Sequence, residues 1–489
     1  MKICVLQPDY STCDVDYKNY DPHRDLSALL PGDTVHHVFL NKLTTYKQLK
    51  ELSRENYDIY VNLCEGYLDW PVPSIDVIHS LDGLNLPYTG TNAVNYDPPK
   101  PVMKYVAYCA GVKTPRFAEL ASGTPVAQQV PELSFPLFVK PARSGDSLGI
   151  DQDSLVYNSA QLEAKVESLL QDGYDPVLVE EYIEGSEYTV LIAAPLPPEE
   201  HCLVFKPVEY QFPAGRSFKT YALKTSELHP GAHIPCRDKQ LEKKLMQSAE
   251  RIFTDFSPVG YARLDFRVDK EGEVYFLEIN FTCSVFYEQG YEGSADEILR
   301  YDPMGKAGFL QHIIREGMAR HAAKQKKYTI HADALNGYGI VANQPIKKGE
   351  IVFPLEGSSQ RIVTRRHVEK NWTPSQVYAF RQYAYPLSKE VFVLWPADPQ
   401  QWAPQNHSCM PNTKFDGLNV IAIADVPAGT ELTLDYGAVM DETMDPFSCE
   451  CGSEHCRKTI KGIPGNSITN RSKKATKIPS VQYIDQQMR

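Results

Sequence analysis

The sequence predicts a multidomain α+β protein, with an N-terminal α/β lobe, a larger mixed region and a β-rich C-terminal part. Its 489 residues exceed the size of one compact domain. The composition, with 42% hydrophobic and 23% charged residues, is that of an ordinary globular protein. Four of the eleven cysteines gather in two short segments, 406–412 and 449–456, which sets the C-terminal part apart.

Residues 1–100 are expected to form the N-terminal α/β lobe. Met1–Leu6 is a short apolar run typical of a buried strand. It is too short and wrongly flanked for a signal peptide, and no apolar stretch reaches the length of a membrane span. The remaining cysteines are scattered, as expected for reduced thiols in an intracellular protein, cytoplasmic or nuclear.

Residues 101–322 contain motifs suited to a phosphorylated ligand. Phe135–Pro141 is typical of a buried strand and includes Lys140. It leads into 142–150, a loop of small residues that allows backbone amides to approach phosphates. Val177–Val190, rich in acidic and aliphatic residues, is predicted to form one strand.

A hairpin is predicted where two alternating segments flank the turn sequence 269–272. The polar residues of its strands are Arg263, Asp265, Glu278 and Asn280. The alternation places them on one side of the sheet, where their oxygens suit Mg²⁺ shared with substrate phosphates. A solvent-facing charged face is the alternative, and the hairpin alone does not decide between the two.

The order of these motifs resembles the ATP-grasp fold, in the branch of the D-alanine–D-alanine ligases. The resemblance covers roughly residues 60–320. It implies ATP and Mg²⁺ as cofactors and amino acids or peptides as substrates. It also implies a mechanism in which ATP phosphorylates a carboxylate and an amine attacks the acyl phosphate.

The same resemblance assigns residue roles. Those implied to bind the nucleotide are Lys104 (or Lys100), Lys140, Glu180, Ile183 through its backbone, Glu187 and Lys224. Those implied to hold Mg²⁺ are Asp265, Glu278 and Asn280. Arg263 would stabilise the charged intermediate.

The substrate half departs from that family. Gly145–Ser147 reads Gly-Asp-Ser where the family carries Gly-Ser-Ser, and Phe281–Ser284 lacks the usual Pro-Gly. Pro8–Ser11 replaces the glycine-rich turn and glutamate that bind the first D-alanine. D-alanyl-D-alanine is therefore not the expected product.

The C-terminal cysteines have the spacing of a metal site. Cys449, Cys451 and Cys456 form CxCx4C, and Cys409 lies in the earlier segment. Four crowded thiolates suit tetrahedral Zn²⁺. Four free buried thiols are the alternative.

Three further motifs precede or separate these cysteines. They are GYGIVA at 337–342, NHSCMPN at 406–412 and ELTLDYG at 431–437. Together they resemble a SET-domain methyltransferase, at 329–447, with a post-SET zinc loop at 448–462. The resemblance implies S-adenosylmethionine as cofactor and a protein lysine as a possible substrate.

The residues that this resemblance implies for the S-adenosylmethionine pocket are Gly337, Tyr338, Gly339, Asn406 and His407. Tyr436 would close the channel through which the lysine amine reaches the methyl group. Methyl transfer needs little beyond an aligned neutral amine and the exclusion of water, which a tyrosine hydroxyl and backbone carbonyls can provide. A core tyrosine is the alternative for Tyr436.

Residues 323–328 are expected to form a charged linker, and 463–489 a basic, flexible tail. A net charge of −12 argues against general nucleic-acid binding. A solvated tail is favoured over a nucleic-acid contact or a localisation signal.

Three functions remain open from the sequence. The favoured one is a two-activity enzyme, an ATP-dependent carboxylate–amine ligase fused to a lysine methyltransferase. The second is a methyltransferase whose ATP-grasp region only binds nucleotide or substrate. The third is a ligase whose SET-like part is a binding module or methylates a small amine.

Overall fold

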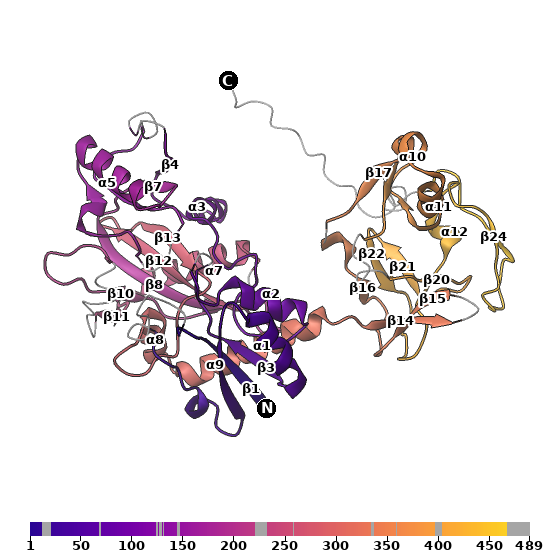
Figure 1. Ribbon diagram of the computed structural model, residues 1–489, viewed down its shortest axis with the longest axis horizontal. Coiled ribbons are helices and arrows are strands. Elements are labelled where there is room, and N and C mark those ends of the chain that lie inside the picture. The colour runs from indigo at the N-terminus through magenta and orange to yellow at the C-terminus, as the bar shows by residue number, and fades with distance from the viewer. Residues whose placement is uncertain are drawn as a thin grey trace. The chain divides into compact units, whose positions relative to one another are not determined.

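The computed structural model describes residues 1–11, 21–67, 70–123, 126, 130, 132–143, 147–220, 232–257, 259–333, 337–357, 359–396 and 403–466. The chain divides into two compact units, Met1–Lys324 and Gln325–Arg489 (Figure 1). Their boundary falls among the residues expected to form the linker. None of the described helices is long and apolar enough to cross a membrane.

The first unit begins with a parallel sheet in the order β2-β1-β3. Its strands are β1 (Lys2–Pro8), β2 (Thr34–Leu40) and β3 (Ile59–Asn62). The helices packed around it are α1 (Thr45–Leu52), α2 (Ile75–Gly83) and α9 (Gly305–Lys324). Alternate residues of β1 enter different cores: Cys4 and Leu6 pack with α1 and α2, whereas Ile3 and Val5 pack with α9. Because successive side chains of a strand point to opposite faces, both faces of β1 are buried.

A four-stranded antiparallel sheet follows, in the order β4-β7-β5-β6. Its strands are β4 (Phe117–Leu120), β5 (Leu137–Pro141), β6 (Leu155–Val156) and β7 (Val177–Glu181). Helix α5 (Ser159–Gln171) covers it with Leu162, Val166 and Leu169.

A six-stranded antiparallel sheet has the order β11-β10-β8-β12-β13, with β9 paired to β8. Its strands are β8 (Gly185–Ala193), β9 (Leu203–Val204), β10 (Val208–Tyr210), β11 (His233–Pro235), β12 (Tyr261–Asp269) and β13 (Val274–Asn280). Its apolar face packs on α3 (Lys100–Cys109) and α7 (Lys239–Asp255), and α8 (Ser294–Arg300) packs with α9. The opposite face carries the charged residues of β8 and β12.

The prediction of one strand over Val177–Val190 is wrong. Those residues form β7 and β8, which belong to different sheets. The strands are separated by residues 182–184, and β8 begins at Gly185, whose φ is +154° and where a Cβ atom would lie 1.9 Å from the carbonyl oxygen of Val268. Only glycine fits this close approach of the start of β8 to β12.

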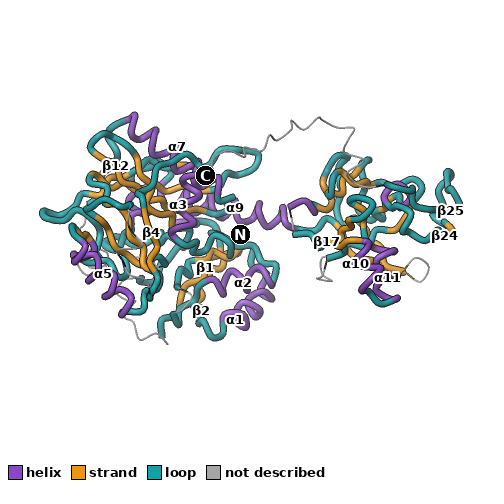
Figure 2. The backbone as a smooth tube through the Cα atoms, turned by 90° about the horizontal axis from the view of Figure 1, so that it is seen from above, coloured by secondary structure: helices purple, strands orange, loops and turns teal. Residues whose placement is uncertain are grey.

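The second unit is rich in short strands joined by long loops (Figure 2). Its strand sets are β14 (Tyr328–Asp333) with β15 (Gly337–Ala342); β16 (Ile351–Phe353), β22 (Asn419–Ala422) and β21 (Thr413–Asp416); β17 (Ile362–Thr364), β19 (Val391–Val393) and β18 (Tyr385–Pro386); β20 (Asn406–His407) with β23 (Thr433–Leu434); and β24 (Phe447–Ser448) with β25 (Thr459–Ile460). The helices are α10 (Arg365–Asn371), α11 (Pro374–Tyr383) and α12 (Tyr436–Val439). The predicted mixed fold with a β-rich C-terminal part is confirmed.

Candidate active sites

A buried ion triad joins three elements of the first unit. Lys104 comes from α3, Lys140 from β5 and Glu180 from β7, and each side chain is almost fully buried. The two ammonium groups lie 2.7 and 2.6 Å from the two carboxylate oxygens of Glu180. Lys104 also donates to the Thr114 hydroxyl at 3.0 Å. The triad has one positive charge more than negative charge, which suits a phosphate.

The electrostatics of the triad follow from burial and pairing. Burial raises the pKa of Glu180, but the two neighbouring ammonium groups outweigh it and hold this pKa at about 2. Burial lowers the pKa of Lys104 to about 8, although Glu180 acts in the opposite direction. An anion bound beside Lys104 would therefore stabilise its charged ammonium form.

The β12–β13 hairpin brings together the predicted acidic cluster. Arg263 lies opposite Asn280, and Asp265 lies opposite Glu278. The Arg263 guanidinium donates to Asp265 at 3.2 and 2.9 Å, and the Thr189 hydroxyl donates to Asp265 at 2.7 Å. The side-by-side placement predicted from the alternating sequence is confirmed.

The donor set of this hairpin fits Mg²⁺. Burial raises the pKa of Asp265, but the neighbouring cations Arg263 and Lys219 lower it by more than burial raises it. The pKa of Asp265 is therefore below its ordinary value. Glu278 lies 3.6 Å from the ammonium group of Lys100. The buried Nδ2 atom of Asn280 has no hydrogen-bond partner. The two carboxylates and the amide oxygen of Asn280 are suitable Mg²⁺ ligands, and the unpaired Nδ2 donor suits a phosphate oxygen.

At the other end of this sheet face, Glu187 is held by two cations that the sequence analysis did not single out. The Lys219 ammonium lies 2.9 Å from one carboxylate oxygen, and the Arg267 guanidinium lies 3.4 Å from the other. Arg267 could have been found, because the alternation that selects Arg263 and Asp265 continues to it. Lys219 lies in a loop and carried no comparable signal. Lys224, the predicted nucleotide lysine, lies outside the described residues.

One cavity connects these groups. Its volume is about 90 Å³, and its walls include Lys140, Glu180, Glu187, Asp265, Arg267 and Glu278. Of the predicted nucleotide and magnesium residues, Lys140, Glu180, Glu187, Asp265 and Glu278 therefore surround a common space, whereas Lys104 and Asn280 are not among its lining residues. Ile183 lines the same cavity, and its carbonyl oxygen accepts a hydrogen bond from Arg267 at 3.0 Å.

In the second unit, two predicted residues, Asn406 and Gly339, converge with Glu431 at the start of β20. Asn406 donates to the Glu431 carboxylate at 2.8 Å. A Cβ atom on Gly339 would lie 2.6 Å from the Glu431 carboxylate and 2.8 Å from the Asn406 amide nitrogen. A side chain at position 339 would therefore push the ends of these two side chains out of their present contact. Its neighbours Gly337 and Tyr338 also lie on β15, and Tyr338 is 69% exposed.

Tyr436 lies beside His407. The backbone N–H of Tyr436 donates to Nδ1 of His407 at 3.1 Å, and its hydroxyl donates to the Gln405 carbonyl at 2.5 Å. Burial raises the pKa of Tyr436, with nearby Tyr385 adding to the effect. The hydroxyl is therefore protonated at neutral pH and can orient an amine without acting as a strong base.

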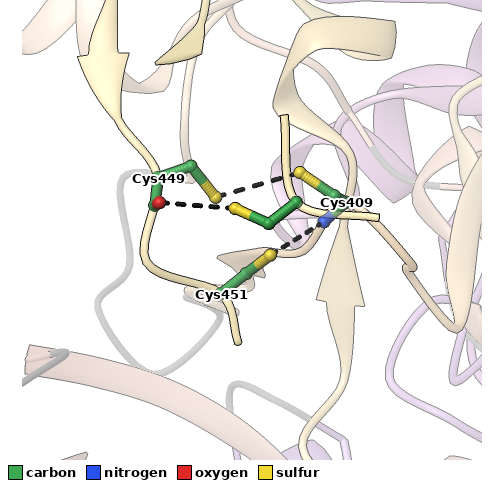
Figure 3. Close-up of side chains that lie close together, drawn as sticks. Cys409, Cys449 and Cys451 are labelled. Carbon is green, nitrogen blue, oxygen red and sulfur yellow. Dashed lines mark hydrogen bonds between the residues drawn. The ribbon is translucent and has the colours of Figure 1, made fainter. Parts of the chain in front are cut away.

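The four predicted cysteines form one cluster. Their sulfur atoms all lie within 4.8 Å of one another, and Figure 3 shows Cys409, Cys449 and Cys451 turned toward a common centre. All four are free thiols, so no disulfide competes. The backbone N–H groups of Cys409 and Arg457 lie 3.5 and 3.3 Å from the sulfurs of Cys451 and Cys409. Four converging sulfurs with amide donors fit a structural Zn²⁺ site.

Two side chains connect this cluster to the segment that contains Tyr436. Nε2 of His407 lies 3.4 Å from the Cys409 sulfur, while its Nδ1 accepts from Tyr436. The guanidinium of Arg457 donates to the Asp435 carboxylate. The thiol cluster and the segment of Tyr436 are therefore connected by hydrogen bonds.

Comparison with known families gives two matches in this chain. Residues 106–286 match the family described as D-ala D-ala ligase C-terminus. Residues 337–437 match the family described as SET domain. The chain therefore contains a D-alanine–D-alanine ligase-like region followed by a SET domain, as the sequence motifs indicated.

Individual proteins resemble the first unit. The D-alanine–D-alanine ligase of Pseudomonas putida (strain GB-1) is 34% identical over 208 residues, which is 41% of this chain and 60% of that enzyme. That of Laribacter hongkongensis (strain HLHK9) is 33% identical over 41% of this chain and 62% of that enzyme. This chain thus spans about 60% of the length of these relatives. Among solved structures, the D-alanine–D-alanine ligase of Bacillus anthracis complexed with ATP has a TM-score of 0.47 and 18% identity, covering 66% of this chain and 100% of that one.

Proposed function

We propose that this chain is a bifunctional enzyme that ligates a carboxylate to an amine with ATP and methylates a lysine with S-adenosylmethionine. The observation that carries the proposal is that Lys140, Glu180, Asp265 and Glu278 line one cavity in a chain that also carries the four-thiol cluster beside Tyr436. We further propose the domain limits 1–100, 101–322, 329–447 and 448–462, with a linker at 323–328 and a tail from 463.

In the ligase reaction, the ion triad neutralises phosphate charge. Lys104 and Lys140 donate to phosphate oxygens, and Asp265, Glu278 and Asn280 hold Mg²⁺. The metal supplies charge neutralisation and alignment of the phosphates. A carboxylate oxygen of the acid takes the γ-phosphoryl group as ADP leaves. The amine then attacks the acyl carbon and phosphate departs, with Arg263 placed to stabilise the negative charge.

The acid and amine differ from two D-alanines in this proposal. The loop after the hairpin is tied to the N-terminal lobe, because Ser284 donates to the carboxylate of Glu65. The buried Arg24 guanidinium lies 3.4 Å from the other oxygen of Glu65. This charged arrangement belongs to the half of the site whose sequence departs from the D-alanine ligases. Amino acids or short peptides remain the substrate class.

In the methyl transfer, this chain positions the reactants. Backbone groups of Gly337, Tyr338 and Gly339, with Asn406 and His407, bind S-adenosylmethionine, which supplies the methyl group on a sulfonium. The neutral lysine nitrogen forms the new bond to the methyl carbon while the carbon–sulfur bond breaks. The Tyr436 hydroxyl orients the amine. The four cysteines hold Zn²⁺ and so order the post-SET loop.

A second function is favoured by one observation. Both carboxylate oxygens of Glu187, the expected ribose contact, are already paired with cations. A methyltransferase whose ATP-grasp region binds nucleotide or substrate without turnover would have the same arrangement.

The decisive experiment measures phosphate release from ATP and Mg²⁺ across a panel of amino acids and short peptides. Release that depends on particular substrates and disappears in Glu278→Gln would establish the ligase. Glu271→Gln is the matched control, since Glu271 is exposed on the turn of the same hairpin. ATP binding without release on any mixture would establish the second function instead.

The methyltransferase is tested separately with labelled S-adenosylmethionine and lysine-containing proteins or peptides. Transfer of the label that falls sharply in Tyr436→Phe is the expected result. Transfer that is unaffected by this substitution would refute the role given to Tyr436.

A further inference from the structure

Arg267 is a buried cation in the wall of the first unit's cavity, and both terminal nitrogens of its guanidinium are hydrogen-bonded. It lies on β12 and is only 3% exposed. Its Nη1 atom donates to the Tyr182 hydroxyl at 2.8 Å and to the Ile183 carbonyl at 3.0 Å. Its Nη2 atom donates to Glu187 at 3.4 Å and to the Ser217 carbonyl. The four hydrogens on these two nitrogens are all used.

Packing holds the guanidinium in this place. Its central carbon lies 4.7 Å from the centre of the Tyr182 ring and 5.8 Å from that of Phe212. Contacts of a guanidinium with aromatic rings are strongest where water is excluded, as it is here. Hydrogen bonds and ring contacts therefore hold the Arg267 guanidinium in one conformation.

Two partners of Arg267, the Ile183 backbone and Glu187, are among the groups that the family resemblance implies for nucleotide binding. By that resemblance, the Ile183 backbone contacts adenine and Glu187 contacts the ribose. Carboxylate and carbonyl oxygens can accept more than one hydrogen bond, but a ribose hydroxyl at Glu187 and an adenine amine at the Ile183 carbonyl would compete with the buried guanidinium for space and for these acceptors. Charge-assisted hydrogen bonds are about twice as strong as the neutral ones that would replace them.

The size of the cavity agrees with this competition. Its volume of about 90 Å³ is well below the roughly 300–1,000 Å³ of ordinary small-molecule sites. Arg267 is one of the side chains that line this space, and it lies where base and ribose would bind in the proposed site.

We propose that Arg267 is the residue that sets nucleotide affinity, acting as an internal competitor for the adenosine end of the site. ATP binds the state in which the guanidinium has turned away, and the affinity is reduced by the fraction of time that Arg267 occupies the site. The phosphate end is formed by other residues, Lys104 and Lys140, and is independent of this competition. The inference rests on the proposed nucleotide site.

The test is calorimetric titration of the full chain and of Arg267→Met with three ligands: ATP with Mg²⁺, adenosine, and inorganic tripolyphosphate. Methionine keeps the length and apolar contact of the side chain, and Glu187 retains Lys219 as its counter-ion. ATP and adenosine are expected to bind about tenfold more tightly to the variant, since hydrogen bonds to a charged group are removed. Tripolyphosphate is expected to bind both proteins equally.

The other outcomes would overturn either the role of Arg267 or the nucleotide site itself. ATP binding that is unchanged or weaker in Arg267→Met would overturn the role of Arg267 while leaving the nucleotide site in place. No binding of ATP or adenosine to either protein would overturn the nucleotide site and this inference with it. Equal tightening for tripolyphosphate would show a general charge effect and also refute the competition.

A second variant protects the test against misfolding. Tyr182→Phe keeps the ring over Arg267 and removes one of its hydrogen bonds. Its ATP affinity is expected to rise about threefold, as the loss of one ordinary hydrogen bond allows. Thermal unfolding identifies a variant that fails to fold, and unchanged affinity in a folded Tyr182→Phe would count against the proposal.

Discussion

The candidate sites of the two units are held together by different interactions. In the first unit, charged side chains from separate elements lie buried in ion pairs around a cavity. In the second, a close backbone approach at Gly339 and four converging thiols shape the site. Buried charges are stable only as a balanced set, whereas thiols of this kind are stabilised by the metal that they bind. The first site should therefore be sensitive to single charges and the second to metal.

Metal removal is expected to have the largest effect. Metal analysis of the purified chain should find about one zinc, because one tetrahedral set of four thiols is present. Zinc binding to such sites contributes about 10 kcal/mol or more to folding. A chelator should therefore abolish methyl transfer and expose the four cysteines to thiol reagents, while ATP binding in the first unit persists.

A matched substitution makes this test specific. Cys449→Ser should lose the zinc, whereas Cys109→Ser, at an exposed free thiol of the first unit, should keep it. A well-folded, zinc-free preparation with full methyl transfer would contradict the assignment of the cluster.

Breaking the ion triad is expected to have the next largest effect. Glu180→Gln leaves two buried ammonium groups without their counter-ion, which costs about 3–5 kcal/mol. Denaturant unfolding should show this loss in the first unit only. Glu184→Gln is the control, because the pair of Glu184 with Lys270 is at the surface and such pairs contribute little. Equal stability of Glu180→Gln and Glu184→Gln would show that the triad does not support the fold.

The pH dependence of stability should separate the units in the same way. The pKa of Glu180 is held at about 2 by its two lysines, below that of an unfolded glutamate. Between the ordinary pKa of glutamate and about 2, the unfolded state binds more protons, so the stabilisation is present above this window and is lost as pH falls through it. Unfolding free energies of the first unit should fall with decreasing pH, and Glu180→Gln should flatten that slope. An unchanged slope in the variant would assign the acid sensitivity to other groups.

Local patterns in the sequence were sufficient for part of this picture. The strand alternation indicated that Asp265 and Glu278 lie on adjacent strands, and CxCx4C indicated the thiol cluster. The exact register of Asp265 with Glu278 depends on an irregularity between Asp265 and Phe266 that the alternation does not contain. The meeting of Lys104 with Lys140 and Glu180 depends on the packing of a helix and two strands that are distant in sequence. Motif order suggested it only through a family resemblance.

The errors have equally physical causes. The break before Gly185 was missed because acidic and aliphatic residues continue through it, while the close approach of Val268 to Gly185 comes from a later strand. Arg267 has the same alternation as Arg263, but its partners Ile183 and Glu187 are brought to it only by tertiary structure. A sequence pattern gives the face of a strand, and the folded chain determines what that face meets.

The smallest expected effect concerns the coupling between zinc and tyrosine. Arg457 lies next to the ligand Cys456 in sequence, and its guanidinium donates to Asp435, the neighbour of Tyr436. The side chain of Arg457 is 44% exposed, so the pair is weakened by solvent. Arg457→Leu should lower methyl transfer by about threefold, the size expected for a pair worth less than 1 kcal/mol.

Lys461→Leu is the matched control, since Lys461 is an exposed cation of the same segment. The two variants should keep equal zinc content, but Arg457→Leu alone should release zinc faster to a chelator, because its side chain restrains the segment that carries Cys456. Equal release rates would show that the loop and the Tyr436 segment are held together by His407 and the metal without help from Arg457. In that case the sensitivity of the second unit to single charges would be lower still, and its contrast with the buried triad of the first unit would be sharper.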